Sequence, residues 1–253
     1  MVGNRATPAV DRRRAPRAVV ARAFSLVDVL VTLAVISILI GLLLPTLSGV
    51  RETTRQVVCR SNVRQVGFGI AMFADAHYLE LLPLSRYPAN EAQRTIQVRS
   101  EGNPYTWDGL GYLYSEEYLD APGVFYCPSH TGTHPASLYV DRWALQPSET
   151  PPGMGDIVIN YQYRGEVMVQ GHTVHSLSGV PGRVALVSDA LTSWDDFNHR
   201  IGTNILRADL SASWYPDAGR RFLLPAGDAD PDAAGKVIGM WGQLDRPPGE
   251  PPQ

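Results

Sequence analysis

The stretch VLVTLAVISILIGLLL, from Val29 to Leu44, contains no charged residue, and its polar side chains are limited to Thr32 and Ser37. Extended to residues 24–47, it can form a helix that crosses a bilayer, because a hydrocarbon core of about 30 Å requires about 20 helical residues. A secretory signal is the alternative, since Thr46-Leu47-Ser48 imitates a small-residue cleavage site. We expect a transmembrane helix, because the apolar run is longer than the roughly 7–15 residues of a signal peptide.

The residues before this segment are strongly basic. Six arginines lie before Phe24 and are opposed by one acidic residue, Asp11. Basic flanks remain on the cytoplasmic side of a membrane helix, so we expect residues 1–23 in the cytoplasm and residues after 47 outside it. A nucleic-acid arm is the other interpretation of the arginines, but the formal charge of the whole chain is -3 and gives no general attraction to nucleic acid.

The junction between the basic and apolar parts carries a recognisable motif, RAFSLVD, from Arg22 to Asp28. It resembles the site cut by prepilin peptidase in type IV pilin-like proteins, where a small residue, usually Gly, precedes Phe, Thr or Ser, Leu, any residue and Glu. Ala23 stands in place of the Gly and Asp28 in place of the Glu. Pro45 is the twenty-second residue counted from Phe24, a position where the family often has proline.

This resemblance, which includes the pseudopilins of type II secretion, implies a specific life history. Prepilin peptidase would cut between Ala23 and Phe24, and the new Phe24 amine would be methylated. Asp28 would then pair with that amine, in its own or a neighbouring subunit. The alternative is that Asp28 lies near the membrane interface without a specific role; an acid in the first helical turn is in any case favoured by the helix dipole.

The partners implied by the resemblance are other pilin-like subunits, the inner-membrane assembly platform and membrane lipid. The expected location is the inner membrane, spanned once, with the head in the periplasm or in a periplasmic or surface fibre. The expected function is that of a structural, non-enzymatic subunit. The rival is a membrane-tethered periplasmic binding or enzymatic domain that does not polymerise.

Beyond Pro45, where we expect a kink, the sequence predicts that the helix continues outside the membrane over residues 48–76. Apolar residues recur there at steps of three and four between polar ones, so one face can pack on the head. Gly67 and Gly69 weaken the helix and allow close packing. The apolar stripe consists of Val63, Val66, Ile70 and Phe73.

Residues 77–245 change character, since prolines, glycines and aromatics separate short segments there, as in an antiparallel sheet with long connections. The expected fold class is α+β, with the long N-terminal helix packed on this β-rich head. Residues 90–102 and 148–155 are expected to be loops, and 246–253 a frayed tail. The predicted strands are Asp156–Tyr163, Val167–Val169, Arg183–Ser188, Thr203–Ala208 and Lys236–Trp241.

Three further passages are similar to a large group of pilin-like proteins: CRSNVRQVG (Cys59–Gly67), VFYCP (Val124–Pro128) and HRIGTNILRAD (His199–Asp209). The last looks like the C-terminal motif of that group, His, nine residues, Asp and Gly, and His199 and Asp209 are expected to fix a strand and its turn. Leu210 replaces the Gly. A non-glycine residue there argues against positive φ, so we expect the strand to continue into residues 210–212.

Cys59 and Cys127 both lie beyond the membrane segment, where thiols can oxidise. Their spacing permits a disulfide or two free thiols, and only geometry can decide.

Two metal sites are conceivable from composition. Cys127, His130 and His134 offer three zinc ligands at close spacing, with His172 or His175 as a fourth. A triad of acids suits calcium, and major pseudopilins as a family bind calcium near the C-terminus, but Pro231 stiffens this run and a solvated loop is the default interpretation. These acids are Asp228, Asp230 and Asp232.

Catalytic motifs are missing from the sequence: no nucleophile elbow, phosphate-binding glycine loop or His-Glu-x-x-His run occurs. A trio of Ser178, His175 and Asp189 can be assembled on paper, but such trios are easy to find among many candidates. We therefore expect a protein that is not an enzyme.

Overall fold

The computed structural model describes residues 25–84, 96–102, 104–165, 167–189, 198–199, 201–217 and 233–247, without the side chains of 45–48 and 233–236. The chain divides into two compact units, residues 1–48 and 49–253. The expected leader and cleavage site (Ala23, Phe24), the three acids of the calcium triad and the tail after residue 247 lie outside the described residues.

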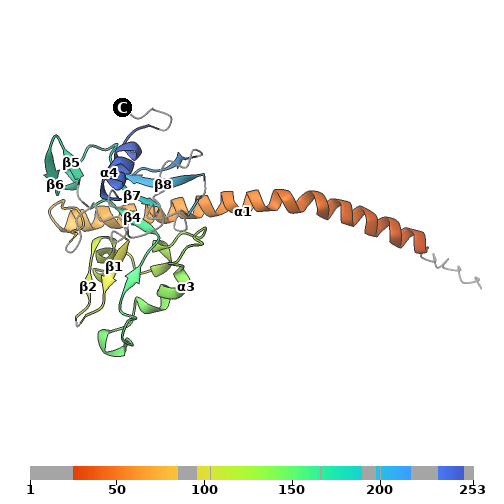
Figure 1. The fold of residues 1–253 in the computed structure, drawn as a ribbon, viewed down its shortest axis with the longest axis horizontal. Coiled ribbons are helices and arrows are strands. Elements are labelled where there is room, and N and C mark those ends of the chain that lie inside the picture. Colours follow the sequence, from red (N-terminus) through yellow and green to blue (C-terminus); the bar gives the residue numbers. More distant parts are fainter. Residues whose placement is uncertain are drawn as a thin grey trace, which may run out of the picture. The chain divides into compact units, whose positions relative to one another are not determined.

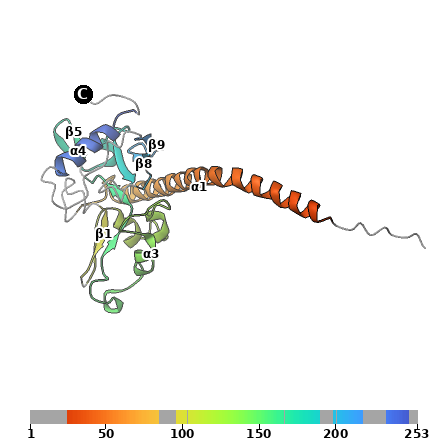
Figure 2. The same cartoon turned by 45° about the vertical axis from the view of Figure 1, so that its right-hand side comes forward.

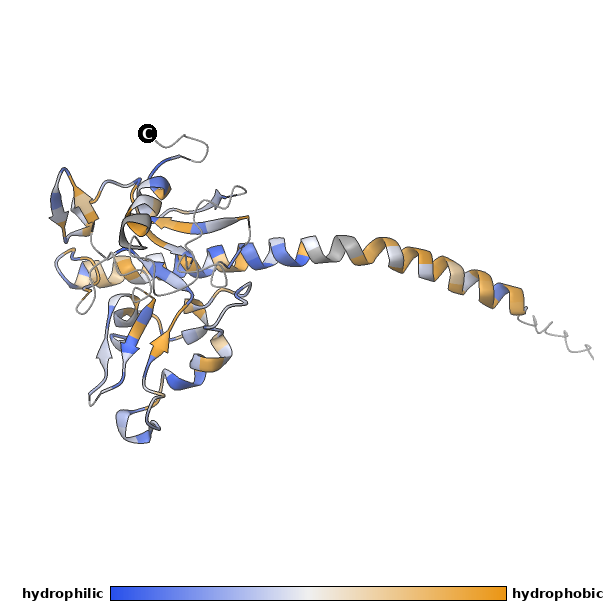
Figure 3. Cartoon of the chain, viewed as in Figure 1, coloured by the Kyte–Doolittle hydropathy of each residue, from blue (hydrophilic) through white to orange (hydrophobic). Residues whose placement is uncertain are grey.

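Helix α1 (Leu26–Ala76) contains the whole apolar stretch and is long and apolar enough to cross a membrane. Its side chains from Leu26 to Leu44 are exposed to the surroundings, and Figure 3 shows near-continuous apolar colouring over this part. Pro45 lies within the helix. A single-pass anchor is therefore consistent with the structure.

The start of α1 is capped by its own first residues. The backbone N–H of Val27 donates to Ser25 Oγ at 3.3 Å, and the backbone N–H of Ser25 donates to Asp28 Oδ2 at 3.2 Å. This reciprocal pair is a variant of the capping box, in which Ser25 Oγ accepts the N–H of the second helical residue instead of the third and Asp stands in place of the usual Glu or Gln. Asp28 thus has a local structural role whether or not it meets another charge.

In the second unit, the remainder of α1 supplies the centre of the hydrophobic core. The predicted stripe is confirmed, because Val63, Val66, Ile70 and Phe73 are all buried in one cluster with residues of the sheets. The expectation for Gly67 is also confirmed. A Cβ there would lie 2.6 Å from Leu206 Cδ1, so a larger residue would require the buried Leu206 side chain to shift.

The head contains antiparallel sheets, which confirms the α+β class (Figure 1). The main sheet has the order β4-β7-β8-β9, a second has the order β2-β1-β3, and β5-β6 is a hairpin. The strands are β1 (Gln97–Ser100), β2 (Thr106–Trp107), β3 (Ile157–Val158), β4 (Tyr161–Tyr163), β5 (Val167–Val169), β6 (His172–Val174), β7 (Ala185–Asp189), β8 (Gly202–Arg207) and β9 (Ala212–Pro216).

Short helices complete the head: α2 (Tyr112–Ser115), α3 (Ala136–Tyr139) and α4 (Ala233–Leu244), with five 3₁₀ turns at 109–111, 122–125, 140–142, 147–149 and 177–179. The two views in Figures 1 and 2 place α4 with the main sheet and α3 near β1. Asp245, after α4, accepts hydrogen bonds from Arg164 Nη1 at 2.9 Å and from the backbone N–H of Ala185 at 2.8 Å. These bonds fix the end of α4 to the sheet.

The predicted strand Lys236–Trp241 is wrong, since this segment belongs to α4. The reason is packing. Val237, Met240, Trp241 and Leu244 are buried together against Ala185, Ile205 and Tyr215 of the main sheet, which is a helical spacing.

Two further strand predictions need correction. The single strand Asp156–Tyr163 is two strands, because Ile157–Val158 pairs with β1 while Tyr161–Tyr163 pairs with β7. The loop predicted over residues 90–102 contains β1, which pairs with β2 close by in the sequence and with β3 from a distant part of the chain. The pairing with β3 is not encoded in the local pattern.

The extension of the strand through Leu210 is also wrong. β8 ends at Arg207, and Leu210 adopts a φ of +65°, the left-handed conformation expected of the glycine it replaces. Asp209 Oδ1 accepts a hydrogen bond from the backbone N–H of Ser211 at 2.9 Å, and Leu210 N–H donates to Arg207 O at 2.9 Å. These bonds and the β8–β9 pairing maintain the tight turn despite the leucine side chain.

Candidate functional site: a buried cysteine, histidine and aspartate cluster

Four ionisable side chains meet in the interior of the head. Cys59 comes from α1, Cys127 from the segment after the turn at 122–125, Asp189 from the end of β7 and His199 from the approach to β8. Their ligand-type atoms all lie within 4.8 Å of one another. Each residue is at most 5% exposed, so the cluster belongs to the core.

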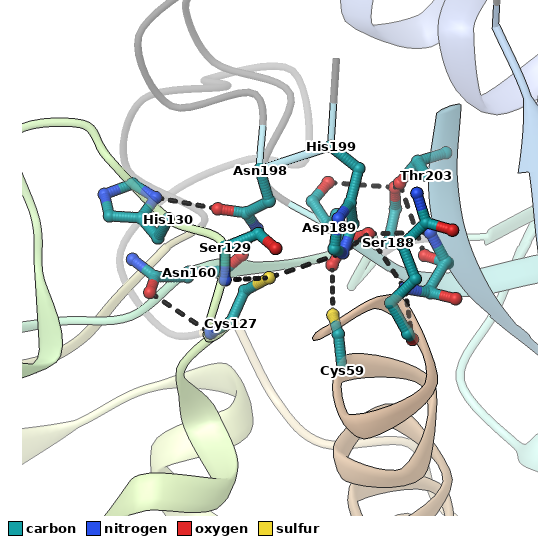
Figure 4. Close-up of polar contacts among 12 residues, drawn as sticks. Cys59, Cys127, Ser129, His130, Asn160, Ser188, Asp189, Asn198, His199 and Thr203 are labelled. Atoms are coloured by element: carbon teal, nitrogen blue, oxygen red, sulfur yellow. Dashed lines mark hydrogen bonds and ion pairs between the residues drawn. The ribbon is translucent and has the colours of Figure 1, made fainter. Parts of the chain in front are cut away.

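The cluster is connected by short polar contacts (Figure 4). Cys59 Sγ donates to Asp189 Oδ1 at 2.9 Å, and Cys127 Sγ lies 3.4 Å from His199 Nε2. The same His199 nitrogen is 3.7 Å from Asp189 Oδ2. The two sulfur atoms therefore approach one carboxylate and one imidazole from α1 and from the 127 segment.

A second layer of groups orients these four side chains. Glu52, on α1, lies 2.8 Å from His199 Nδ1 and also accepts a hydrogen bond from Ser129 Oγ. The backbone N–H of Asn204 donates to Asp189 Oδ2 at 2.7 Å. The hydroxyl of Tyr161 is 3.4 Å from Cys59 Sγ. The ring of His199 is thus fixed at both nitrogens, and the carboxylate of Asp189 at both oxygens.

The environment shifts the pKa values of the cluster. Burial lowers the pKa of His199, but its hydrogen bond with Cys127 and the charges of Asp189 and Cys127 outweigh burial and raise that pKa to about 9. Burial raises the pKa of Cys127, but hydrogen bonds with Cys59 and His199 lower it overall. Burial, followed by the hydrogen bond with Cys127, raises the pKa of Cys59 well above its usual value. The surroundings therefore favour the protonated forms of His199 and Cys59 and shift Cys127 in the direction of the thiolate.

Three kinds of chemistry are compatible with such a group: metal binding, disulfide formation and nucleophilic catalysis by a thiolate beside an imidazole. Catalysis requires that a substrate reach the nucleophile, whereas Cys127 is 5% exposed and His199 is fully buried. A closed interior cluster is typical of a structural site.

Both cysteines are free thiols in the structure, and their sulfurs belong to the cluster. The sequence placed Cys59 and Cys127 in a disulfide or as free thiols, and the proximity of their side chains is compatible with either redox state. Of the two residues of the C-terminal motif, His199 lies in the cluster and Asp209 in the turn after β8, where its hydrogen bonds with Ser211 lower its pKa.

The zinc set predicted from local spacing is not assembled. His130 Nδ1 is 2.7 Å from Asn198 Oδ1, and His130 Nε2 accepts the backbone N–H of His134 at 3.3 Å, whereas Cys127 is directed toward His199. His172 and His175 are both exposed on and beside β6. The catalytic trio of Ser178, His175 and Asp189 is not assembled either. Ser178 is exposed and hydrogen-bonded to Ser176, whereas Asp189 is buried.

All four members of the cluster were noticed in the sequence, but not as one site. The two cysteines were considered as a disulfide, His199 as part of the C-terminal motif and Asp189 as part of a catalytic trio. Sequence reasoning missed the orienting residues Glu52, Ser129 and Asn204 entirely. Cys59 and Asp189 are 130 positions apart, and Cys127 and His199 are 72 apart, so no short motif contains them. A signal was present only in the fact that three of the resembling passages each contribute one member.

A separate groove of about 880 Å³ opens on the other part of the head. Glu117 and Asp120 add negative charge to it, and Gln146 adds an amide. Its aromatic lining consists of Tyr105, Trp107, Tyr114, Tyr118 and Trp143.

Comparison of the chain with models of protein families, with curated proteins and with solved structures gave no match. Arguments about function therefore depend on the residues and the geometry of this chain.

Proposed function

We propose that the chain is a pilin-like structural subunit, anchored by the first part of α1 and processed between Ala23 and Phe24. The observation that supports this proposal is the composition of α1 along its length. Residues 26–44 are apolar on all sides with one acid, Asp28, in the first turn, while residues 59–73 contribute a buried stripe to the head. A helix with these two parts is suited to pack against lipid or neighbouring helices first and against its own head second.

In this proposal the leader is cytoplasmic and the head periplasmic, in agreement with the positive-inside rule. After cleavage, the Phe24 amine provides a positive charge close to the carboxylate of Asp28. A carboxylate within an apolar helix costs about 2.5–3.5 kcal/mol on insertion scales at the bilayer centre, so pairing with a neighbouring amine favours association between subunits.

N-terminal sequencing of the mature protein tests the processing step. Phe24 as the first residue, carrying a methyl group, is the expected result. An intact Met1, or a start near Gly49, would contradict the proposal and favour a tethered or a released head.

Assembly is tested by variants that separate the two roles of Asp28. Asp28→Asn retains an oxygen that can accept the Ser25 N–H but removes the charge, whereas Ser25→Ala removes the other half of the capping box and leaves the charge. We expect Asp28→Asn and Asp28→Ala to remain in the membrane and to lose most cross-linking between subunits. Asp28→Glu, Ser25→Ala and the exposed control Asp75→Ala should cross-link normally. Losses in Asp28→Ala and Ser25→Ala together with normal cross-linking in Asp28→Asn would assign the effect to capping alone.

A second candidate is a membrane-tethered periplasmic binding domain that does not polymerise. The aromatic groove favours it, because aromatic faces with nearby polar groups suit small organic ligands. This candidate predicts a retained leader and no intersubunit cross-links, so the same two experiments distinguish the functions.

A further inference from the structure

We propose that Cys59, Cys127, Asp189 and His199 bind a single Zn²⁺ ion that links α1 to the main sheet and to the 127 segment. The four donors are two sulfurs, one imidazole nitrogen and one carboxylate oxygen; each type binds zinc in proteins, and four is the number of ligands in a structural zinc site. All four are buried, and all lie in the unit formed by residues 49–253. The proposal therefore does not depend on assembly of the chain.

Two of the distances between donor atoms agree with a tetrahedral zinc site, and a third requires a small movement of the side chains. Usual zinc–ligand distances place tetrahedral ligand atoms about 3.3–3.8 Å from one another. Cys127 Sγ and His199 Nε2 are 3.4 Å apart, and His199 Nε2 and Asp189 Oδ2 are 3.7 Å apart. Cys59 Sγ is closer to Asp189, at 2.9 Å, because it donates a hydrogen bond there. Loss of that proton to a metal would lengthen this contact.

The surroundings of the cluster orient the donors toward one point. His199 directs Nε2 inward and Nδ1 toward Glu52 Oε1 at 2.8 Å, the arrangement in which a carboxylate fixes a metal-binding histidine. The backbone N–H of Ser129 is 3.4 Å from Cys127 Sγ, and the backbone N–H of Asn204 is 2.7 Å from Asp189 Oδ2. Hydrogen bonds of this kind stabilise ligands that carry negative charge. Figure 4 shows the donors converging from four segments of the chain.

The donor set selects among metals. Calcium and magnesium prefer six or more oxygen ligands, whereas this cluster offers two sulfurs and one nitrogen. Zinc accepts sulfur, nitrogen and oxygen in four-coordinate sites. On binding, Zn²⁺ replaces the thiol proton of Cys59, any proton on Cys127 and the Nε2 proton of His199, all of which pass to solvent, and the neutral imidazole of His199 retains its proton on Nδ1 beside Glu52.

A disulfide is the competing fate of the two sulfurs, and the buried partners argue against it. Oxidation would remove the S–H of Cys59, which donates to Asp189 Oδ1, and would alter the contact of the Cys127 sulfur with His199 Nε2. Asp189 and His199 would then remain in the core with fewer partners, which is costly for buried polar groups. A metal ion satisfies all four side chains at once.

The first test uses the full-length chain, extracted in detergent without chelator or added reductant. Metal analysis should give about one zinc per chain, which is the stoichiometry that a single four-ligand site requires. Replacement of the zinc by Co²⁺ should give the absorption of a tetrahedral centre together with sulfur-to-cobalt charge transfer. These measurements require no variant, so they do not depend on a substitution that prevents folding.

Variants assign the ligands. Cys59→Ser and His199→Asn should each lose the bound zinc, whereas His172→Asn, which changes an exposed histidine on β6, should retain it. Glu52→Gln is a milder change, because it alters only the group that positions His199. It should retain zinc at high metal concentration but bind it about 10–100-fold more weakly in competition with a chelator.

Three results would overturn the proposal. One is a chain that carries no zinc, lacks reactive thiols after denaturation and has the mass of a disulfide. Another is a reduced chain that takes up neither Zn²⁺ nor Co²⁺. The third is zinc that remains at full occupancy in Cys59→Ser and His199→Asn.

Discussion

The two parts of α1 differ in how many apolar side chains they carry and in how these are arranged around the helix. Between residues 26 and 44, apolar side chains surround the helix and are exposed; Leu30, Ile38 and Leu42 are each more than half exposed. Between residues 59 and 73, the apolar side chains form a single stripe that is buried in the head, and Phe68, which lies outside the stripe, is exposed. An apolar surface on all sides suits lipid, whereas a single apolar stripe between polar residues suits packing on a protein core.

The largest effect is expected from variants that disrupt membrane insertion of residues 26–44. In the double variant Ile36→Arg with Leu39→Arg, each arginine adds about 3 kcal/mol to the cost of insertion, so the pair removes most of the driving force of the segment. We expect the full-length protein to leave the carbonate-resistant membrane fraction. The matched control, Val57→Arg with Val58→Arg, changes exposed positions of the second part and should remain in the membrane. Equal membrane fractions for both double variants would show that residues 26–44 are not the anchor.

A smaller effect is expected from variants of the buried apolar stripe between residues 59 and 73. Ile70 is fully buried, so Ile70→Ala should lower the free energy of unfolding of the head by about 2–5 kcal/mol. Phe68→Ala, two positions away and 57% exposed, should change it by less than about 0.5 kcal/mol. Denaturant unfolding of the detergent-solubilised chain, followed by tryptophan fluorescence, measures both values. A larger loss in Phe68→Ala would mean that the helix packs by its opposite face.

The smallest effect on stability is expected from substitutions of two glycines of α1, Gly67 and Gly49. Gly67→Val should destabilise the head by about 1–3 kcal/mol, because its Cβ meets Leu206, which is itself fully buried. Gly49→Val should be neutral within about 0.5 kcal/mol, since nothing lies within 4 Å of a Cβ at that position. The same unfolding experiment applies. Two neutral variants would indicate that helix and sheet are not in close contact at Gly67.

Features of the fold that depend on neighbours in sequence were predictable. The stripe from Val63 to Phe73 follows from spacing alone, and β5, β7 and β8 lie within two residues of the predicted strands. Features that depend on distant partners were not. Val237 and Ile238 favoured a strand by propensity, but burial of Trp241 against the main sheet stabilises a helix there.

Leu210 illustrates a different limit. The absence of glycine correctly indicated that positive φ is unfavourable for this residue, by about 1–2 kcal/mol, yet the hairpin adopts it. The hydrogen bond that Asp209 accepts from Ser211 and the pairing of β8 with β9 offset that cost. The local sequence correctly indicated that this backbone conformation is unfavourable for Leu210, but the pairing of β8 with β9 stabilises the turn that requires it.

The buried cluster was predictable in its parts and not in its assembly. Cys59, Cys127 and His199 each lie in a passage that resembles pilin-like proteins, and Asp189 was noticed only as part of a triad that does not form. Their meeting requires that α1, β7 and the 127 segment pack together, which is information about the whole head. Glu52 carried no signal at all, since a charged residue early in a polar helical stretch is usually a solvated one.

The position of the Glu52–His199 contact has a mechanical consequence. Among the side chains of α1 that the structure describes beyond the apolar segment, that of Glu52 is the first to bond to the sheet region, and Cys59 follows two turns later. A pulling force applied to the amino end of α1 reaches these polar bonds before it reaches the apolar stripe. These bonds therefore resist extraction of the helix from the head. In single-molecule stretching, the head of Glu52→Gln should unfold at a lower force.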